Sequence, residues 1–196
     1  MSSSPASSSS SVSPDTAVRR LNWGSGTAPA PGWINSDVKP GPGIEISCDI
    51  RDGLPLETGS VDYAVSVHAL QELPLDDVVP ALHELRRVLR PGGALRLVLP
   101  DLEKAIDAYR RGDRTYFAVP DSDTRSLGGK LVTHVLWYGY SRTLFTRDFV
   151  EELLHRAGFA DVRPCACGET TTPFPGIVEL DNRPAESLYV EAIKNA

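Results

Sequence analysis

Residues 87–101 read RVLRPGGALRLVLPD, and this stretch decides how the chain is expected to fold. It reads as the end of a helix, a tight Pro-Gly-Gly turn at residues 91–93, and then a strand. Pro91 cannot continue a helix, and the two glycines supply the positive φ angles that a sharp reversal needs. The apolar run that follows predicts a buried central strand, which ends at Pro100 and Asp101. The stretch therefore predicts a layered α/β sheet.

The rest of the chain alternates between strand and helix patterns. Strands are expected at residues 18–23, 32–38, 45–49 and 61–68, after the Pro-Gly-Gly turn, and at residues 160–167 and 187–193. Helices are expected at residues 75–89, 102–111 and 147–157, the last with Thr146 as its N-cap. These patterns predict one α/β domain over residues 15–196.

Two segments depart from the alternation of strands and helices. Residues 1–14 are nearly all Ser, with Pro and Ala, and are expected to form a disordered, dispensable tail. Residues 113–143 are less periodic and hold much of the aromatic content. Because long connections in compact domains are usually functional or disordered, we expect this second segment to be an aromatic-rich substrate insertion.

A second signal lies at residues 21–26, which read LNWGSG and follow the first expected strand. Asp37 ends the second expected strand. A glycine turn after one strand and a carboxylate after the next make a nucleoside-binding edge. The dinucleotide fingerprint G-x-G-x-x-G would also need a glycine at position 29, where this chain has Pro29.

Together these segments resemble the class I (Rossmann-like) S-adenosylmethionine (SAM)-dependent methyltransferases. The short link from Gly26 to Asp37, with PGWINSDV at residues 31–38, is similar to a bacterial subgroup of small methyltransferases, the methyltransferase type 11 family. The resemblance implies a doubly wound, seven-stranded, mostly parallel sheet with helices on both faces and an antiparallel last strand. It also implies SAM as the cofactor.

The resemblance assigns roles in cofactor binding to residues at the strand ends. The glycine turn would contact the methionyl part of SAM, Asp37 would accept the ribose hydroxyls, and the segment after the third strand would bind adenine. His68, after the fourth strand, matches a position near the sulfonium and the substrate. The residues assigned to the cofactor are Asn22, Gly24, Ser25, Gly26, Asp37, Asp49, Ile50 and His68.

Two positions depart from the pattern of the family. The residue two before the first glycine is usually acidic, and here it is Asn22, which weakens the expected grip on the methionyl ammonium. The family commonly reads H-x-L-E-H after the fourth strand, whereas residues 68–72 read HALQE. Glu72 therefore stands where a second histidine is usual, and this chain lacks that second histidine.

The expected reaction is methyl transfer to an oxygen or nitrogen of a small molecule, such as a natural product or a sugar. A base is needed only if the acceptor must lose a proton, and His68 and His134 are the candidates. No metal is required. The acceptor pocket is expected between His68, Asp101, His134, Trp137, Tyr138 and Tyr140. His68 could equally be a structural histidine, and the aromatic cluster could be core packing.

Composition excludes several kinds of partner. The net charge is −6, with 26 acidic and 20 basic residues and no basic cluster, which argues against nucleic acid and anionic membranes. Cys48, Cys165 and Cys167 form neither a disulfide framework nor a zinc site, which favours a cytoplasmic protein. A homodimer is compatible with the sequence.

Two other functions stay open: an NAD(P)-dependent oxidoreductase, and a catalytically silent SAM-binding partner subunit.

Overall fold

The computed structural model describes residues 18–195. The Ser-rich segment at residues 1–14, which the sequence predicts to be disordered, lies outside this range.

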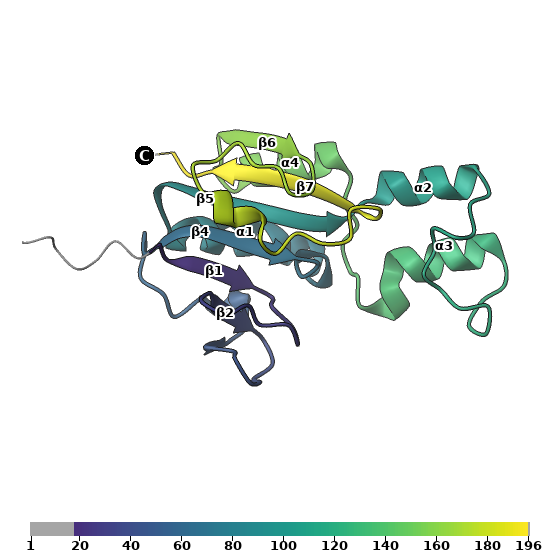
Figure 1. Cartoon of the computed structure of the whole chain (residues 1–196), viewed down its shortest axis with the longest axis horizontal. Helices are drawn as coiled ribbons and strands as arrows, with labels where there is room; N and C mark the ends of the chain where they lie inside the picture. Colours follow the sequence, from purple (N-terminus) through teal and green to yellow (C-terminus); the bar gives the residue numbers. More distant parts are fainter. Residues whose placement is uncertain (1–17, 196) are drawn as a thin grey trace, which may run out of the picture.

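Seven strands form one sheet in the order β3-β2-β1-β4-β5-β7-β6 (Figure 1). Neighbouring strands are parallel from β3 to β5, and β7 runs antiparallel to both β5 and β6. The strands are β1 (Arg20–Trp23), β2 (Ile34–Asp37), β3 (Ile46–Ser47), β4 (Val61–Val67), β5 (Leu89–Pro100), β6 (Asp161–Cys165) and β7 (Ser187–Ile193). The predicted sheet with its reversed last strand is confirmed.

Four α-helices and four short 3-10 helices accompany the sheet in residues 18–195. The α-helices are α1 (Leu75–Val88), α2 (Leu102–Arg110), α3 (Leu127–Leu136) and α4 (Arg147–Arg156). The 3-10 helices are η1 (Ile50–Asp52), η2 (Leu70–Glu72), η3 (Trp137–Gly139) and η4 (Pro175–Val178). The link from β1 to β2 holds no helix, as its short length predicts.

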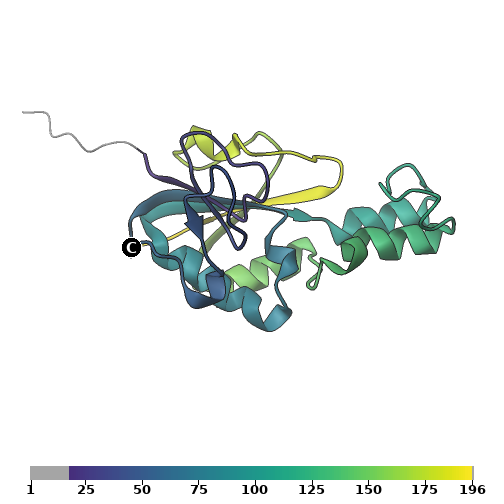
Figure 2. The same ribbon diagram turned by 90° about the horizontal axis from the view of Figure 1, so that it is seen from below.

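The two faces of the sheet are covered differently. α1 and α4 pack on one face, where their leucines join the main apolar cluster of the sheet (Figure 2). Alternate strand residues point to the other face. There Trp33, Tyr63, Phe174 and Ile177 form a separate cluster under η4 and the loops. Helices are expected on both faces; the structure has two α-helices on one face and a single 3-10 helix with loops on the other.

The Pro-Gly-Gly segment lies inside β5 rather than before it. α1 ends at Val88, Leu89 already pairs with Val61, and pairing then resumes between Ala94 and Tyr63. The extra residues of β5 form an irregularity, which Gly92 accommodates with its φ of 76°. The expected turn between helix and strand is therefore a bulge within the strand.

Arg96 interrupts the apolar run of β5, yet its side chain is fully buried. Its guanidinium lies 2.5 Å from a carboxylate oxygen of Asp181 and 2.7 Å from one of Glu191. It also donates to the carbonyl oxygens of Ala166 and Glu169. Because a buried charge must be paired, this network fastens the loop after β6 onto the sheet.

Residues 102–143, here called the arm, hold α2 and α3, which lie side by side at one end of the molecule (Figures 1 and 2). A small apolar cluster that includes Ala105, Ala108 and Phe117 joins the two helices. The sequence does not predict α3. The helix contains Gly128 and Gly129, and some of its apolar residues are exposed, so its apolar positions do not follow the spacing of an amphipathic helix.

Two local predictions are wrong. Thr146 occupies the N-cap position of α4, but its hydroxyl donates to the Asp148 carboxylate instead of capping a backbone N–H. β6 ends at Cys165, two residues before the predicted end of this strand, so Cys167 lies beyond it. Ala166 leaves the ladder here because its carbonyl accepts from Arg96.

Candidate active site

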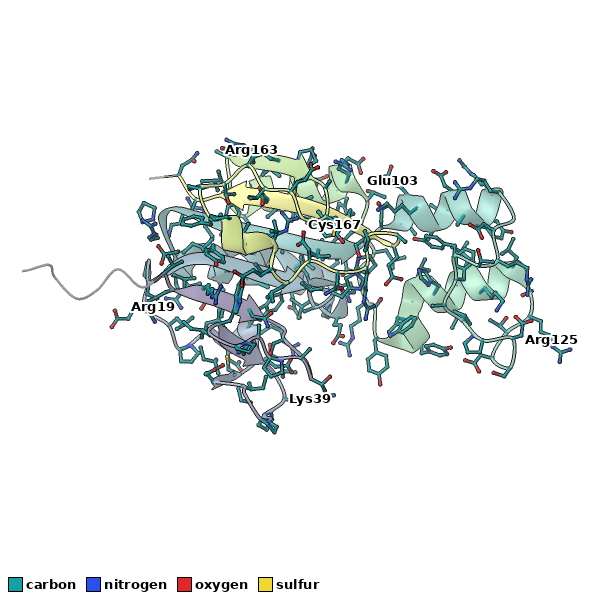
Figure 3. All side chains as sticks on the ribbon, viewed as in Figure 1. Arg19, Lys39, Glu103, Arg125, Arg163 and Cys167 are labelled. Carbon is teal, nitrogen blue, oxygen red and sulfur yellow. The ribbon has the colours of Figure 1, made fainter. Side chains whose placement is uncertain are left out.

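A cleft of about 890 Å³ opens at the carboxyl ends of β1, β2 and β3. Open α/β sheets bind ligands at this edge, and small-molecule sites typically have volumes of roughly 300–1,000 Å³. Lys39, labelled in Figure 3, lies on the loop after β2 and is one of the lining residues. The lining residues that the sequence assigns to the cofactor are Gly24, Gly26, Asp37, Asp49 and Ile50.

The glycine turn after β1 has a conformation that larger residues rarely adopt. Gly24 has a φ of 72° and Gly26 a φ of 57°. A Cβ atom on Gly24 would stand 2.2 Å from the Cβ of Ala69, the residue before η2. The N–H groups of Gly24 and Ser25 both donate to the carbonyl oxygen of Ser36, at 2.8 and 3.0 Å. The turn therefore lies tightly between the ends of β2 and β4.

Asp37 ends β2 and braces the glycine turn. One of its carboxylate oxygens accepts a 2.8 Å hydrogen bond from the N–H of Gly26, and the other accepts from the N–H of Lys39 at 2.9 Å. A carboxylate can accept about four hydrogen bonds. Asp37 therefore keeps acceptor capacity on the wall of the cleft.

Asp49 follows β3 and caps η1 through the N–H of Arg51. The Arg51 guanidinium also lies 2.6 Å from the Asp49 carboxylate and itself lines the cleft. These hydrogen bonds hold the pKa of Asp49 below its usual value. Ile50 presents a buried apolar side chain beside them. This end of the cleft combines a fixed carboxylate with an apolar surface.

Three other residues assigned to the cofactor, Asn22, Ser25 and His68, do not line the cleft. The Asn22 side chain is buried and donates a 2.9 Å hydrogen bond to Asn35 Oδ1, which also accepts from the N–H of Ala30. Asn22 therefore stabilises the loop between β1 and β2. Ser25 contributes its main chain to the turn, and its hydroxyl has no hydrogen-bond partner in the described residues.

Two of the charged residues on the cleft wall that the sequence does not predict, Glu72 and Arg142, come from turns on the far side of β1 from Asp37 and Asp49. Glu72 ends η2, and Arg142 lies in the loop before α4; both are exposed and line the cleft. Partial burial raises the pKa of Glu72, the charge of Asp37 adds to this, and Lys39 and Arg142 oppose it. No sequence period singles out either residue, because each lies in a turn or loop.

A second, small cavity of about 20 Å³ lies at the base of the arm. Such a volume holds about one water molecule. Two residues of the expected acceptor pocket, Asp101 and His134, line it together with Gln71. The buried side chains of Gln71 and His134 each leave one polar atom, Oε1 and Nδ1, without a partner in the described residues. The cavity therefore offers unsatisfied hydrogen-bonding groups.

His68 follows β4 in a left-handed conformation, with a φ of 49°, which is rare for a residue with a side chain. Its Nε2 lies 2.8 Å from the hydroxyl oxygen of Ser187, and it lines neither cavity. Burial lowers the pKa of His68 to about 4, with smaller contributions from Arg183 and His134. His68 is therefore neutral near pH 7 and a weak base.

His134 is buried in the arm, with 8% of its side chain exposed. Burial lowers its pKa, while Glu186, whose carboxylate lies 4.0 Å from its Nε2, opposes this. The nearby aromatic residues are placed differently from the expected pocket. Trp137, Tyr138 and Tyr140 are 42–62% exposed and line neither cavity.

The two cavities share a wall made of two short segments. Gln71 lines the small cavity and the next residue, Glu72, lines the cleft. Ser141 and Thr143 likewise line the small cavity, while Arg142 between them lines the cleft. The N–H groups of Arg142 and Thr143 donate to the carbonyl oxygen of Gln71 at 2.8 and 3.1 Å. The segment before α4 is thereby joined to η2, which follows β4.

Within residues 18–195, no group of three or more His, Cys, Asp or Glu side chains is arranged to hold a metal ion. In the same range, no helix has the length and apolar character that spanning a bilayer requires.

Comparisons with known proteins agree with this geometry. Residues 32–97 match the family model described as "Methyltransferase domain". The chain is 45% identical over 68 residues to an uncharacterized 37.1 kDa protein in transposon TN4556 of Streptomyces fradiae. The matched segment covers 35% of this chain and 19% of that protein. The chain is also 31% identical over 110 residues to the demethylmenaquinone methyltransferase of Staphylococcus carnosus. This matched segment covers 56% of this chain and 44% of that protein. The matches thus span less than half the length of these curated relatives.

A solved structure shares the fold along most of the chain. It is a SAM-dependent methyltransferase of Thermotoga maritima, described as a possible histamine N-methyltransferase, with a TM-score of 0.56 and 20% identity. The likeness covers 92% of this chain and 84% of that one. The chain therefore has the fold of the class I SAM-dependent methyltransferases, and its residues 32–97 match a methyltransferase domain.

Proposed function

We propose that this protein transfers a methyl group from SAM to an oxygen or nitrogen of a small molecule. The observation that carries the proposal is the cleft at the ends of three neighbouring strands, lined by the glycine turn, Asp37 and Asp49. The lack of room for a Cβ at Gly24 fits a turn that must pack tightly while its backbone faces a ligand. Pro29 lines the cleft where a dinucleotide fingerprint needs glycine, which favours SAM over NAD(P).

The residues around the cleft fit the parts of SAM in the order of the strands. Asp49 and Ile50 would hold the adenine, Asp37 would accept from the ribose hydroxyls, and the turn from Gly24 to Gly26 would contact the methionyl part. When bound, SAM supplies a methyl group already activated by its sulfonium. The chain then needs only to align the acceptor in line with that methyl group and to exclude water.

The small cavity at the base of the arm is where we place the acceptor's reactive group. Its wall is shared with the cleft, so a group bound there lies beside the cofactor site. Gln71 Oε1 and His134 Nδ1 are free to bond a hydroxyl or an amine. Since burial lowers the pKa of His134, its imidazole is neutral near pH 7 and can take a proton from the acceptor.

The free thiols of Cys48, Cys165 and Cys167 support a cytoplasmic location.

Binding and turnover test the proposal separately. SAM and S-adenosylhomocysteine should raise the melting temperature of the full chain, whereas NADH should not. Transfer of a labelled methyl group to a panel of amines, alcohols and phenols should then identify the acceptor class. His134→Ala should lower turnover and leave SAM affinity nearly unchanged. Stabilisation by NADH alone would contradict the proposal, and SAM binding without turnover on any acceptor would favour the silent partner subunit.

A further inference from the structure

Glu72 and Arg142 are two opposite charges on the cleft wall that the folded chain does not use. The carboxylate of Glu72 has only longer-range electrostatic partners, namely Asp37, Lys39 and Arg142. Within residues 18–195, neither the Glu72 nor the Arg142 side chain makes an ion pair or a hydrogen bond. Charged side chains on a cleft wall without a protein partner are available to a charged ligand.

The strand order places these charges at one end of the cleft. Asp49 follows β3 at the edge of the sheet, whereas η2, which ends with Glu72, follows β4 on the other side of β1. The residue before η2, Ala69, is the one that a Cβ on Gly24 would strike. Arg142 is held at the same place by the 2.8 Å bond from its N–H to the carbonyl oxygen of Gln71. Both charges therefore lie beside the glycine turn and away from Asp49.

We propose that Glu72 and Arg142 hold the amino-acid end of the cofactor, with Glu72 accepting from its α-ammonium and Arg142 donating to its α-carboxylate. This inference rests on the proposed function. The Glu72 carboxylate takes over the task of the acidic residue that this chain lacks at Asn22, whose side chain is committed to Asn35. The guanidinium fork of Arg142 matches a carboxylate in geometry. An α-ammonium beside Glu72 would also offset the burial and the nearby Asp37 charge that raise the pKa of this carboxyl.

Three ligands separate this role from general binding to the cleft. SAM and S-adenosylhomocysteine both carry the α-ammonium and the α-carboxylate, and only SAM carries the sulfonium charge. 5′-Methylthioadenosine keeps the adenosine and the sulfur but lacks both amino-acid charges. Calorimetry on the full chain would measure the affinity of each ligand for the wild type and for Glu72→Gln and Arg142→Gln. Glu57→Gln and Arg147→Gln are matched controls, since both residues are exposed and do not line the cleft.

The expected result is a loss of about tenfold or more in the affinity for SAM and S-adenosylhomocysteine in both variants, the factor that a lost hydrogen bond to a charged group produces. The affinity for 5′-methylthioadenosine should stay within about twofold of the wild type, well below that factor. The control variants should bind all three ligands like the wild type. Because Glu72 and Arg142 are exposed, melting temperatures should not change.

Three results would overturn the inference. Equal losses for all three ligands would mean that the substitutions disturb the whole cleft. A loss for SAM but not for S-adenosylhomocysteine would place Glu72 at the sulfonium instead. Unchanged affinities would show that neither charge contacts the cofactor. If the wild type binds none of the three ligands, the proposed function fails, and this inference fails with it.

Discussion

Gly24 and Ala69 follow two neighbouring strands, β1 and β4, and lie in close contact. A Cβ atom added to residue 24 would stand 2.2 Å from the Cβ of Ala69. The contact fixes the spacing between the glycine turn and η2. Because η2 ends with Glu72, the same contact sets the distance between the turn and the charged wall of the cleft.

Gly24→Ala should therefore lower the free energy of unfolding by about 2–5 kcal/mol, through the clash with Ala69 and the strained positive φ. Gly26→Ala is the control, because residue 26 also has a positive φ but a Cβ there would meet no other atom within 4 Å. It should cost only about 1–2 kcal/mol. Urea denaturation would measure both. The double variant with Ala69→Gly should recover part of the loss, and no recovery would contradict the steric explanation.

Asp37→Ala should weaken the binding of SAM by roughly 1–3 kcal/mol, because it leaves buried ribose hydroxyls without an acceptor. It should weaken 5′-methylthioadenosine by the same factor, since that ligand keeps the ribose. Calorimetry measures both affinities. An unchanged affinity would remove Asp37 from the cofactor site, and a loss confined to SAM would assign it to the amino-acid end.

His68 should make stability depend on pH in a specific window. Its pKa is about 4 in the folded chain and about 6.5 when unfolded, so below pH 6.5 the unfolded state binds the proton first. The free energy of unfolding should therefore fall as the pH drops from about 6.5 to about 4, by up to about 3 kcal/mol.

His68→Asn isolates this effect, because asparagine tolerates the left-handed conformation and does not titrate. Denaturant unfolding of both proteins across this window should show a stability difference that shifts toward the variant in acid. A difference that is independent of pH would mean that His68 titrates normally.

Arg96→Met should be strongly destabilising, by about 3–5 kcal/mol, because it leaves the carboxylates of Asp181 and Glu191 buried without their cation. Adding Asp181→Asn and Glu191→Gln removes both charges and should restore a large part of the loss. Chemical denaturation of the single and triple variants measures this. A triple variant less stable than the single one would show that the amides cannot replace the charged network.

Most of the fold could be predicted from the sequence, because β-strands buried in a parallel sheet and amphipathic helices leave local patterns. The strand Ser187–Ile193 and the start of α1 at Leu75 agree with the expected bounds. α3 and the loops that cover the second face of the sheet could not be predicted, because they depend on packing between segments distant in the sequence. The aromatic side chains at 137–140 resemble pocket residues by composition alone, but residues 137 and 138 adopt positive φ angles and the side chains remain exposed.

The cleft could be predicted in part for the same reason. Gly24 and Asp37 directly follow or end strands, so the edge of the sheet brings them together. Glu72 and Arg142 are far apart in the sequence, and their segments are joined by main-chain bonds to Gln71 and by a hydrogen bond from the Thr143 hydroxyl to the carbonyl oxygen of Leu73, which no sequence pattern encodes. The place of Asn22 could not be predicted in this way, because strand alternation directs its side chain away from the cleft and toward Asn35.

The shared wall between the cleft and the small cavity has an energetic consequence. A ligand that orders residues 71–72 and 141–143 from one side also sets the positions of their neighbours that face the other side. Part of the ordering cost is then paid only once, so occupation of either cavity should favour occupation of the other. Thermodynamic linkage requires the effect to be reciprocal: the factor by which cofactor tightens acceptor binding equals the factor by which acceptor tightens cofactor binding.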